Sequence, residues 1–277
     1  MLHGPQKKPG SAALRGSSAG ASEGLIAPSR RRFVIIIPAF NEQSSLPQTL
    51  SELLTALRQH QDTLPSCEIV VVDDGSTDGT RSVALSSGVG VLTHACNLGY
   101  GAAVSTGLQY AVSRDAHAAV VLDADGQHDP RALLELLTPV VEGKADVAIG
   151  SRFMSAAPYR MGFARRVGAF VFGRVLSALA RQPIRDTTSG YQCMSRRALA
   201  LLARDYPTDY PDAQVILQLV LSGVAVVEIP VPMRPRTAGR SMHSLGSVFR
   251  YPGRMILSLL VVMLRYGLRR IGARRRT

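Results

Sequence analysis

Short runs of apolar, mostly β-branched residues recur along the first half of the chain, and each run is followed by a turn and a longer stretch of mixed character. The runs do not alternate between apolar and polar residues, so the pattern predicts strands that are covered on both faces of a sheet. Five such strands are predicted, at residues 33–37, 69–72, 89–92, 119–122 and 147–149.

The stretches between these runs have the character of helices. Four are predicted there, at residues 44–58, 80–87, 102–113 and 131–142. Asp129 is the expected N-cap of the last one, and Pro130 is expected at its first position. Strands that alternate with helices predict an α/β fold with a mostly parallel central sheet, and such folds bind ligands at the carboxyl ends of their strands. The second half is less regular, with helices predicted at residues 162–181, 196–202 and 213–222 and a strand at 224–229.

The two ends of the chain differ from this middle part. Residues 1–30 are rich in glycine, serine and alanine without apolar periodicity, so a flexible N-terminal extension is predicted. One domain is predicted at residues 31–244, because 277 residues suit a single domain with tails better than two domains. Residues 245–277 are predicted to form a basic amphipathic C-terminal helix and tail.

Charge is distributed unevenly along the chain, whose net charge is +12. Residues 229–277 contain eleven arginines and no acidic residue, and residues 1–32 are also basic, so the part between them is net acidic. Basic ends suit either nucleic acid or anionic lipid headgroups, because both present phosphate groups. Charge alone does not distinguish these two partners.

An apolar run at residues 255–264 lies between Arg254 and Arg265. As a helix it would be about 15 Å long, which is half the thickness of the hydrocarbon core of a bilayer. A helix lying in the membrane interface is therefore predicted, and an ordinary helix packed on the domain is the alternative. Because the N-terminus lacks the apolar stretch of a secretory signal, the expected location is peripheral, at the cytoplasmic face of a membrane.

The strongest chemical signal is the acidic sequence LDADGQHDP at residues 122–130, where a predicted strand ends and a helix begins. Asp123 and Asp125 lie two positions apart on a turn, so their carboxylates can converge on one hard cation. Mg²⁺ or Mn²⁺ prefers oxygen ligands and keeps coordination sites for diphosphate oxygens and water. A turn that caps the next helix is the alternative, which accounts for Asp129 alone. His128 is predicted to be a polar loop residue rather than a ligand.

Polar turns also follow two other predicted strands. The sequence DDGSTDGT at residues 73–80 follows the second strand, and its carboxylates can accept hydrogen bonds from a nucleobase or ribose. The first strand ends in PAFNE at residues 38–42, which offers an aromatic ring and a carboxylate at the same edge of the sheet. Each turn alone is a weak signal. Because the carboxyl ends of parallel strands lie at the same edge of a sheet, the three polar turns together predict one ligand-binding crevice.

The order and wording of these motifs resemble the family 2 inverting glycosyltransferases, and within them the dolichyl-phosphate mannose synthases and other polyprenyl-phosphate sugar synthases. The resemblance covers about residues 32–240. It is carried by PAFNE (38–42), VVDDGSTDGT (71–80), NLGYGAAVSTGL (97–108), VVLDADGQHDP (120–130), IGSRF (149–153), DTTSGYQCMSRRAL (186–199) and VPMRPRTAGRSMHS (231–244). It implies a single nucleotide-sugar-binding, Rossmann-like GT-A domain and a hexosyl transfer that depends on Mg²⁺ or Mn²⁺.

The resemblance also implies roles for individual residues. It places the nucleotide-sugar donor against Pro38, Phe40, Glu42, Asp74, Gly99, Asp123 and Asp125. It makes Asp123, Asp125 and Gln127 the group that binds metal and diphosphate. Arg234 and Arg236 become candidates for a loop that closes over the donor and acceptor phosphates, since guanidinium groups suit bidentate phosphate recognition.

One position departs from the family pattern. Many relatives carry a lysine after the NxG turn, whereas this chain has Tyr100 in NLGYG. If that lysine supports the nucleotide, its role falls here to another group or is absent. The donor is therefore left as a UDP-sugar or a GDP-sugar.

The acceptor that the resemblance implies is a polyprenyl or dolichyl phosphate, used in cell-envelope glycan or glycoprotein assembly. Candidate contacts to the acceptor phosphate are Arg152, Arg165, Arg234 and Arg236, with Arg160 and Arg166 as further candidates. A lipid phosphate is already anionic at pH 7 and needs no strong base, whereas a hydroxyl acceptor needs one, for which Asp186 is the candidate. The predicted catalytic residues are thus Asp123, Asp125, Asp186 and Arg234.

The same motifs leave other functions open. A family 2 enzyme that adds one sugar to a non-lipid saccharide or protein is the first alternative, and a nucleotidyltransferase that releases pyrophosphate is a remote one. A nucleic-acid-binding module would leave the acidic motifs without purpose, so no nucleic acid partner is expected. Processive polysaccharide synthases carry a QxxRW element, and this chain has no tryptophan. Because one short helix anchors weakly, a small membrane-spanning partner is expected.

Overall fold

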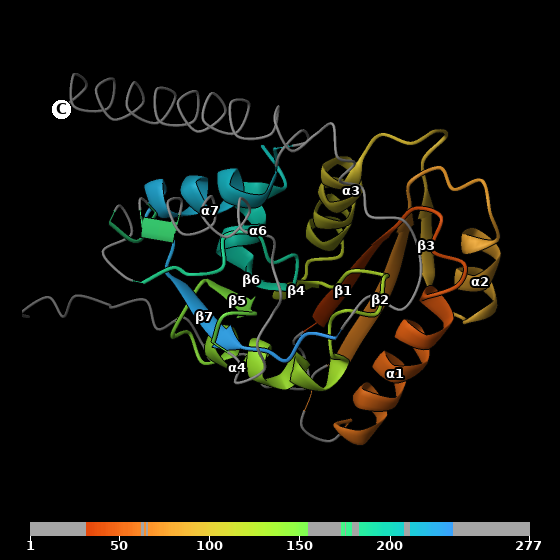
Figure 1. The fold of residues 1–277 in the computed structure, drawn as a ribbon, viewed down its shortest axis with the longest axis horizontal. Coiled ribbons are helices and arrows are strands. Elements are labelled where there is room, and N and C mark those ends of the chain that lie inside the picture. Colours follow the sequence, from red (N-terminus) through yellow and green to blue (C-terminus); the bar gives the residue numbers. More distant parts are fainter. Residues whose placement is uncertain are drawn as a thin grey trace, which may run out of the picture.

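The computed structural model describes residues 32–61, 64, 66–154, 173–174, 176–178, 183–207 and 211–234. These residues form one sheet with helices on both faces, and Figure 1 shows the sheet between the two helical layers. The α/β class that the strand and helix pattern predicts is confirmed.

The sheet has the strand order β3-β2-β1-β4-β6-β5-β7. Its strands are β1 (Arg32–Ala39), β2 (Ser66–Asp73), β3 (Gly90–Thr93), β4 (Ala118–Val121), β5 (Val147–Ser151), β6 (Gln192–Ser195) and β7 (Val226–Pro230). The described pairs are parallel except that β6 is antiparallel to both β4 and β5. The sheet is therefore mostly parallel, as predicted.

The strand β6 was not predicted from the sequence. It has four residues, QCMS, with no β-branched side chain, and a polar residue at its start. Cys193 and Met194 are nevertheless fully buried, each on a different face of the sheet. A short strand of this composition has no periodicity to reveal it, and its neighbours on both sides fix its conformation.

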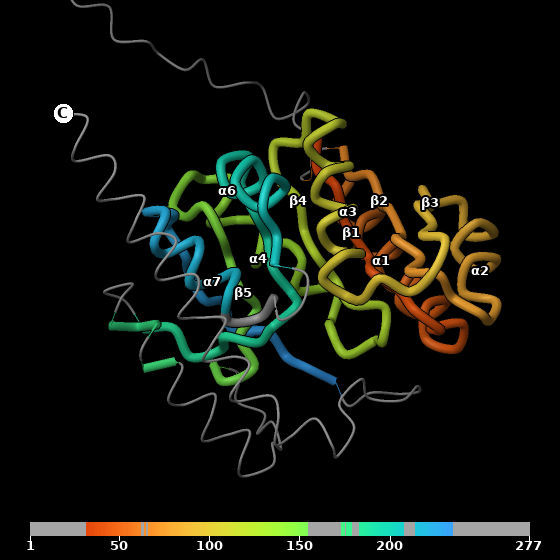
Figure 2. Tube along the Cα trace, turned by 90° about the horizontal axis from the view of Figure 1, so that it is seen from above, coloured from red at the N-terminus to blue at the C-terminus, as the bar shows by residue number. Residues whose placement is uncertain are grey.

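The helices are α1 (Leu46–Gln59), α2 (Thr80–Ser86), α3 (Tyr100–Ser113), α4 (Leu133–Val141), α6 (Arg196–Leu202) and α7 (Pro211–Leu221). Apolar side chains of α3, α6 and α7 join one buried cluster, and those of α1, α2 and α4 join another. Figure 2 shows α3, α6 and α7 spread over one face of the sheet. In β1, Val34 and Ile36 enter the first cluster while Ile35 and Ile37 enter the second, which explains the uninterrupted apolar run.

The predicted ends of the elements agree with the structure to within a few residues, with one difference before α4. Asp129 is an N-cap, as predicted, and its carboxylate accepts a hydrogen bond of 3.0 Å from the amide of Arg131. It caps the 3₁₀ turn η2 (Pro130–Ala132), and α4 begins only after that turn.

Several predictions fall on residues that the structure does not describe. These are the N-terminal extension at 1–30, the C-terminal helix and tail at 245–277, and most of the helix at 162–181. Within the described ranges, no helix has the length and apolar character that crossing a bilayer requires.

Candidate functional site

The predicted motifs meet at one edge of the sheet. The strands β1, β2, β4 and β5 run in the same direction, so their carboxyl ends share that edge. The loop before β6 reaches the same edge because β6 runs the other way, with Gln192 opposite both Val121 and Ile149. The topology therefore brings together segments that lie far apart in the sequence.

The loops after β1 and β2 are held together by hydrogen bonds. The amide of Thr77 donates to Asn41 Oδ1 over 2.9 Å, and the amide of Glu42 donates to Thr80 Oγ1 over 2.8 Å. The Glu42 carboxylate accepts from the Ser45 hydroxyl at the start of α1. Phe40, directly after β1, is 38% exposed, so its ring is open to a ligand. The candidate nucleotide residue Pro38 is buried within β1.

The predicted nucleotide residue Asp74 is buried and binds the loop that leads into α3. Its Oδ1 accepts from the amide of Leu98 over 2.9 Å, and its Oδ2 accepts from the amide of Gly99 over 2.8 Å. His94 Nδ1 lies 2.7 Å from Oδ1, and His94 Nε2 lies 2.9 Å from Thr106 Oγ1. Asp74 thus fixes the start of α3 relative to β2, whatever it contacts in a donor complex.

Gly75 allows the loop after β2 to pass directly over the loop before α3. Its φ of +70° lies in the left-handed region, and a Cβ there would lie 2.4 Å from the carbonyl carbon of Cys96. Such a contact would push Cys96 away and disturb the amides that Asp74 binds. A residue without a side chain is therefore required at this position.

Gly75→Ala is expected to lower the free energy of unfolding by about 3 kcal/mol, since it adds a steric clash to left-handed strain. Gly88→Ala is the matched control, because Gly88 has φ +71° but nothing within 4 Å of the added Cβ. It carries only the strain, about 1–2 kcal/mol. Urea unfolding of both variants measures the difference, and equal losses would show that the close approach at Gly75 does not matter.

Asp123 and Asp125 follow β4 at the centre of the edge. The Asp123 side chain is 28% exposed, and Asp125 is 9% exposed. Asp125 Oδ1 accepts from the amide of Gln127 over 3.0 Å, which closes a tight turn. The three members of the predicted metal group thus lie in one short turn.

His128 lies in the loop after β4, where a polar loop residue was predicted, and it is buried there. It is 4% exposed and stacks on Tyr191 with ring centroids 4.9 Å apart. Its Nδ1 accepts from the amide of Asp123 over 3.0 Å, so the proton of the neutral ring sits on Nε2. Burial is the main cause that lowers the pKa of His128 to about 4, which leaves it uncharged at pH 7. His128 therefore supports the backbone of the acidic turn.

Arg152 and Asp186 form a buried ion pair beside this turn. The carboxylate of Asp186 is fully buried and accepts from the amide, Nε and Nη2 of Arg152 over 2.9, 2.8 and 2.7 Å. The amide of Asp186 in turn donates to Glu228 Oε1 over 2.6 Å, and burial raises the pKa of Glu228. A carboxylate with these partners orients a guanidinium, and the arrangement does not favour Asp186 as a general base.

Arg234 ties the segment after β7 to the acidic turn. Its amide donates to the carbonyl of Gln127 over 2.9 Å, and its guanidinium contacts Glu52 Oε2 at 2.6 Å and Asp129 Oδ1 at 3.4 Å. The hydrogen bond from Gln48 is the first cause that lowers the pKa of Glu52, and Arg234 adds to it against the effect of burial. Arg165 and Arg236, like Arg160 and Arg166, lie outside the described residues.

The acidic turn has the donor chemistry of a site for a hard cation. No group of three or more His, Cys, Asp or Glu side chains in the described ranges is arranged to hold a metal. The partly exposed Asp123 carboxylate and the buried Asp125 carboxylate suit Mg²⁺ or Mn²⁺, because these ions use few protein carboxylates and complete their shells with phosphate oxygens and water. The residues therefore fit a cation that arrives with a diphosphate.

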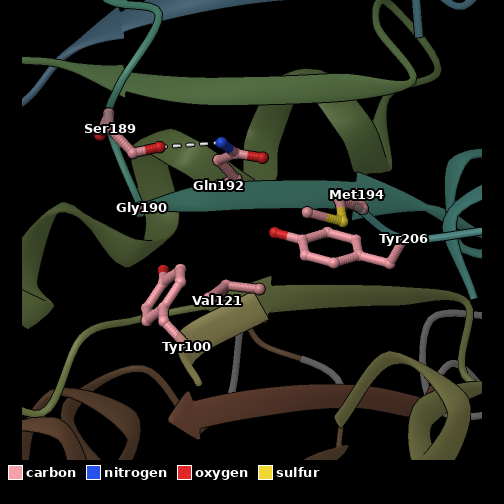
Figure 3. Close-up of a pocket in the computed structure, with 7 residues that line it drawn as sticks. All are labelled: Tyr100, Val121, Ser189, Gly190, Gln192, Met194 and Tyr206. Atoms are coloured by element: carbon pink, nitrogen blue, oxygen red, sulfur yellow. Dashed lines mark hydrogen bonds between the residues drawn. The ribbon is translucent and has the colours of Figure 1, made fainter. Parts of the chain in front are cut away.

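A small pocket lies close to Asp123, over the neighbouring strands β4 and β6 (Figure 3). Its lining residues are Tyr100, Val121, Ser189, Gly190, Gln192, Met194 and Tyr206. Gln192 donates from Nε2 to the carbonyl of Ser189 over 2.8 Å, whereas its buried Oε1 has no hydrogen-bond partner. The sequence alone does not indicate this pocket, because its lining residues come from four separate segments that only the fold brings together.

The chain is similar to known glycosyltransferases in sequence and in fold. A family model described as glycosyl transferase family 2 matches residues 34–201. The chain is 33% identical over 243 residues to a polyprenol monophosphomannose synthase of Mycolicibacterium smegmatis, covering 83% of this chain and 87% of that protein. It is 30% identical to an undecaprenyl-phosphate mannosyltransferase of Micrococcus luteus, covering 78% of this chain and 89% of that one. Among solved structures, one with a similar fold is glucosyl-3-phosphoglycerate synthase from Mycobacterium tuberculosis in complex with Mn²⁺, UDP and glucosyl-3-phosphoglycerate. The TM-score is 0.64 at 22% sequence identity, and the match covers 84% of this chain and 80% of that chain.

Proposed function

The chain belongs to glycosyltransferase family 2. We propose that it transfers a sugar from a nucleotide-sugar donor to the phosphate of a polyprenyl lipid, with inversion at the anomeric carbon. Its single α/β domain with a mostly parallel sheet is the GT-A fold that the resemblance implied. The donor is a UDP-sugar or a GDP-sugar.

The observation that carries this proposal is the pair of carboxylates on the turn after β4. Asp123, Asp125 and Gln127 would hold Mg²⁺ or Mn²⁺, and the ion would neutralise the negative charge of the departing nucleoside diphosphate. The loops after β1 and β2 would hold the nucleotide, and Phe40 is exposed at the same edge of the sheet as the acidic turn. Glu42 supports this loop and contributes a carboxylate close to it.

The lipid acceptor is supported by the chemistry of the site and by the relatives. One of these relatives is named for the synthesis of polyprenol monophosphomannose, and the other is named an undecaprenyl-phosphate mannosyltransferase. A phosphate monoester is already anionic at pH 7 and attacks without a strong base. This agrees with the buried ion pair of Asp186 with Arg152, in which the carboxylate already accepts three hydrogen bonds from Arg152. Arg152, Arg165, Arg234 and Arg236 are the proposed contacts to the acceptor phosphate.

The enzyme is proposed to act peripherally at the cytoplasmic face of a membrane. The supporting feature is the basic sequence at residues 229–277, with eleven arginines and no acidic residue. Each basic residue near an anionic surface is worth about 1 kcal/mol of attraction. A small membrane-spanning partner is proposed to strengthen this association.

Incubation with polyprenyl phosphate, Mn²⁺ and a panel of UDP- and GDP-sugars tests the proposal. The expected product is a polyprenyl-phosphate sugar, identified by mass analysis of the extracted lipid, together with free nucleoside diphosphate. EDTA is expected to stop the reaction, and added Mn²⁺ to restore it. Parallel reactions with phosphoglyceric acid and with free saccharides serve as acceptor controls, and sugar transfer to one of these but not to the lipid would contradict the proposed acceptor.

A further inference from the structure

Tyr100 is the first residue of α3 and reaches across the edge of the sheet to the acidic turn. Its hydroxyl donates a hydrogen bond of 3.0 Å to Asp123 Oδ1. The ring packs against the buried apolar cluster to which α3 contributes, so the position of the hydroxyl is fixed. Gly99, just before it, has a φ of +97° and its amide is bound by Asp74. The direction of the Tyr100 side chain is thus set by the loop that Asp74 holds.

The opposite side of this contact is formed by Gly190. Figure 3 shows Tyr100 directed toward the segment of Ser189 and Gly190. A Cβ on Gly190 would lie 2.7 Å from the Tyr100 hydroxyl and 2.8 Å from Asp123 Oδ2. Hydroxyl and carboxylate therefore occupy the space that any other residue at 190 would fill. Three segments, the start of α3, the turn after β4 and the loop before β6, fit together at this one hydrogen bond.

An aspartate that is 28% exposed can adopt several side-chain orientations, and a metal site needs one of them. The hydrogen bond from the fixed Tyr100 hydroxyl to Oδ1 favours one orientation before the cation arrives, and His128 Nε2 lies 3.6 Å from the other oxygen, Oδ2. Partners of this kind, which orient a metal ligand, are typically worth about 10- to 100-fold in metal affinity or activity.

We propose that Tyr100 is a positioning residue that holds the Asp123 carboxylate in the orientation that binds the divalent cation, with Gly190 leaving the space for this contact. The inference rests on the proposed function in one respect, which is the assignment of Asp123 to the metal. It gives a role to the position at which many relatives carry a lysine. Here a neutral donor orients the carboxylate without adding positive charge beside the cation.

Tyr100→Phe removes only the hydroxyl and tests the proposal. The Mn²⁺ affinity of the purified protein, measured by electron paramagnetic resonance with saturating UDP or GDP, is expected to fall about 10-fold. The Mn²⁺ concentration for half-maximal transfer should rise by a similar factor, while kcat at saturating Mn²⁺ changes much less. Tyr110→Phe is the matched control, because Tyr110 lies on the same helix and its hydroxyl donates to a carboxylate, Glu68, that has no part in the site.

The outcomes separate this inference from the proposed function. Equal Mn²⁺ affinity of parent and Tyr100→Phe would overturn the positioning role and leave the function standing. A parent protein that binds no Mn²⁺ with either nucleotide would instead overturn the metal assignment itself. Gly190→Ala gives a second test, since it should weaken Mn²⁺ binding although Tyr100 and Asp123 are both present. A Gly190→Ala protein that binds Mn²⁺ like the parent would contradict the proposed packing.

Discussion

Asp125→Ala is expected to lower the rate of sugar transfer roughly 1000-fold, because the cation would lose one of its two carboxylate ligands. The departing diphosphate would then be less stabilised, and a roughly 1000-fold lower rate corresponds to about 4 kcal/mol of lost transition-state stabilisation. The fold should persist, because Asp125 lies on the turn after β4 and is not a member of either buried apolar cluster. Activity is measured as kcat/KM for the donor, and stability by thermal unfolding.

Glu142→Ala is the control for Asp125→Ala. It also removes one negative charge, but its partner is Lys144 in an exposed ion pair at the end of α4. It should retain the parent activity. If Asp125→Ala were as active as Glu142→Ala, the metal site would lie elsewhere.

Asp186→Ala is expected to lower the free energy of unfolding by about 3–5 kcal/mol, because it leaves the Arg152 guanidinium largely buried without its partner. For a domain of this size, that corresponds to a fall in Tm of about 10 °C. Glu142→Ala again serves for comparison, since the loss of an exposed ion pair costs at most about 1 kcal/mol.

The double variant Asp186→Ala with Arg152→Met separates pairing from simple truncation. Removing both charges should recover part of the lost stability, because a buried pair that is replaced by apolar groups leaves no unpaired charge. A general base at Asp186 would give a different pattern, in which Asp186→Ala keeps the parent Tm and loses activity. That result would favour a hydroxyl acceptor over a lipid phosphate.

The sequence predicted the parts of the fold that depend on local pattern. Ile35, Ile36 and Ile37 are apolar in succession because β1 is covered on both faces, and this property is visible in the sequence itself. A turn with two carboxylates at the end of a strand was also predicted around Asp125, because capping of the next helix accounts for Asp129 but not for Asp123 and Asp125.

The features that the sequence did not reveal depend on contacts between distant segments. His128 is polar and follows a loop motif, but it is buried because Tyr191, 63 positions later, stacks on it. The strand β6 has no apolar pattern and is defined by its neighbours β4 and β5. The hydrogen bond from Tyr100 to Asp123 joins the start of α3 to the turn after β4, and no local pattern in NLGYG indicates this contact.

The most direct test of the central claim is a crystal structure of the protein with Mn²⁺ and a nucleoside diphosphate, with the ion located by its anomalous scattering. The expected result is one strong anomalous peak within coordination distance of Asp125, bridging that carboxylate and the diphosphate. A peak at another place, with the diphosphate bound away from the turn after β4, would contradict the account.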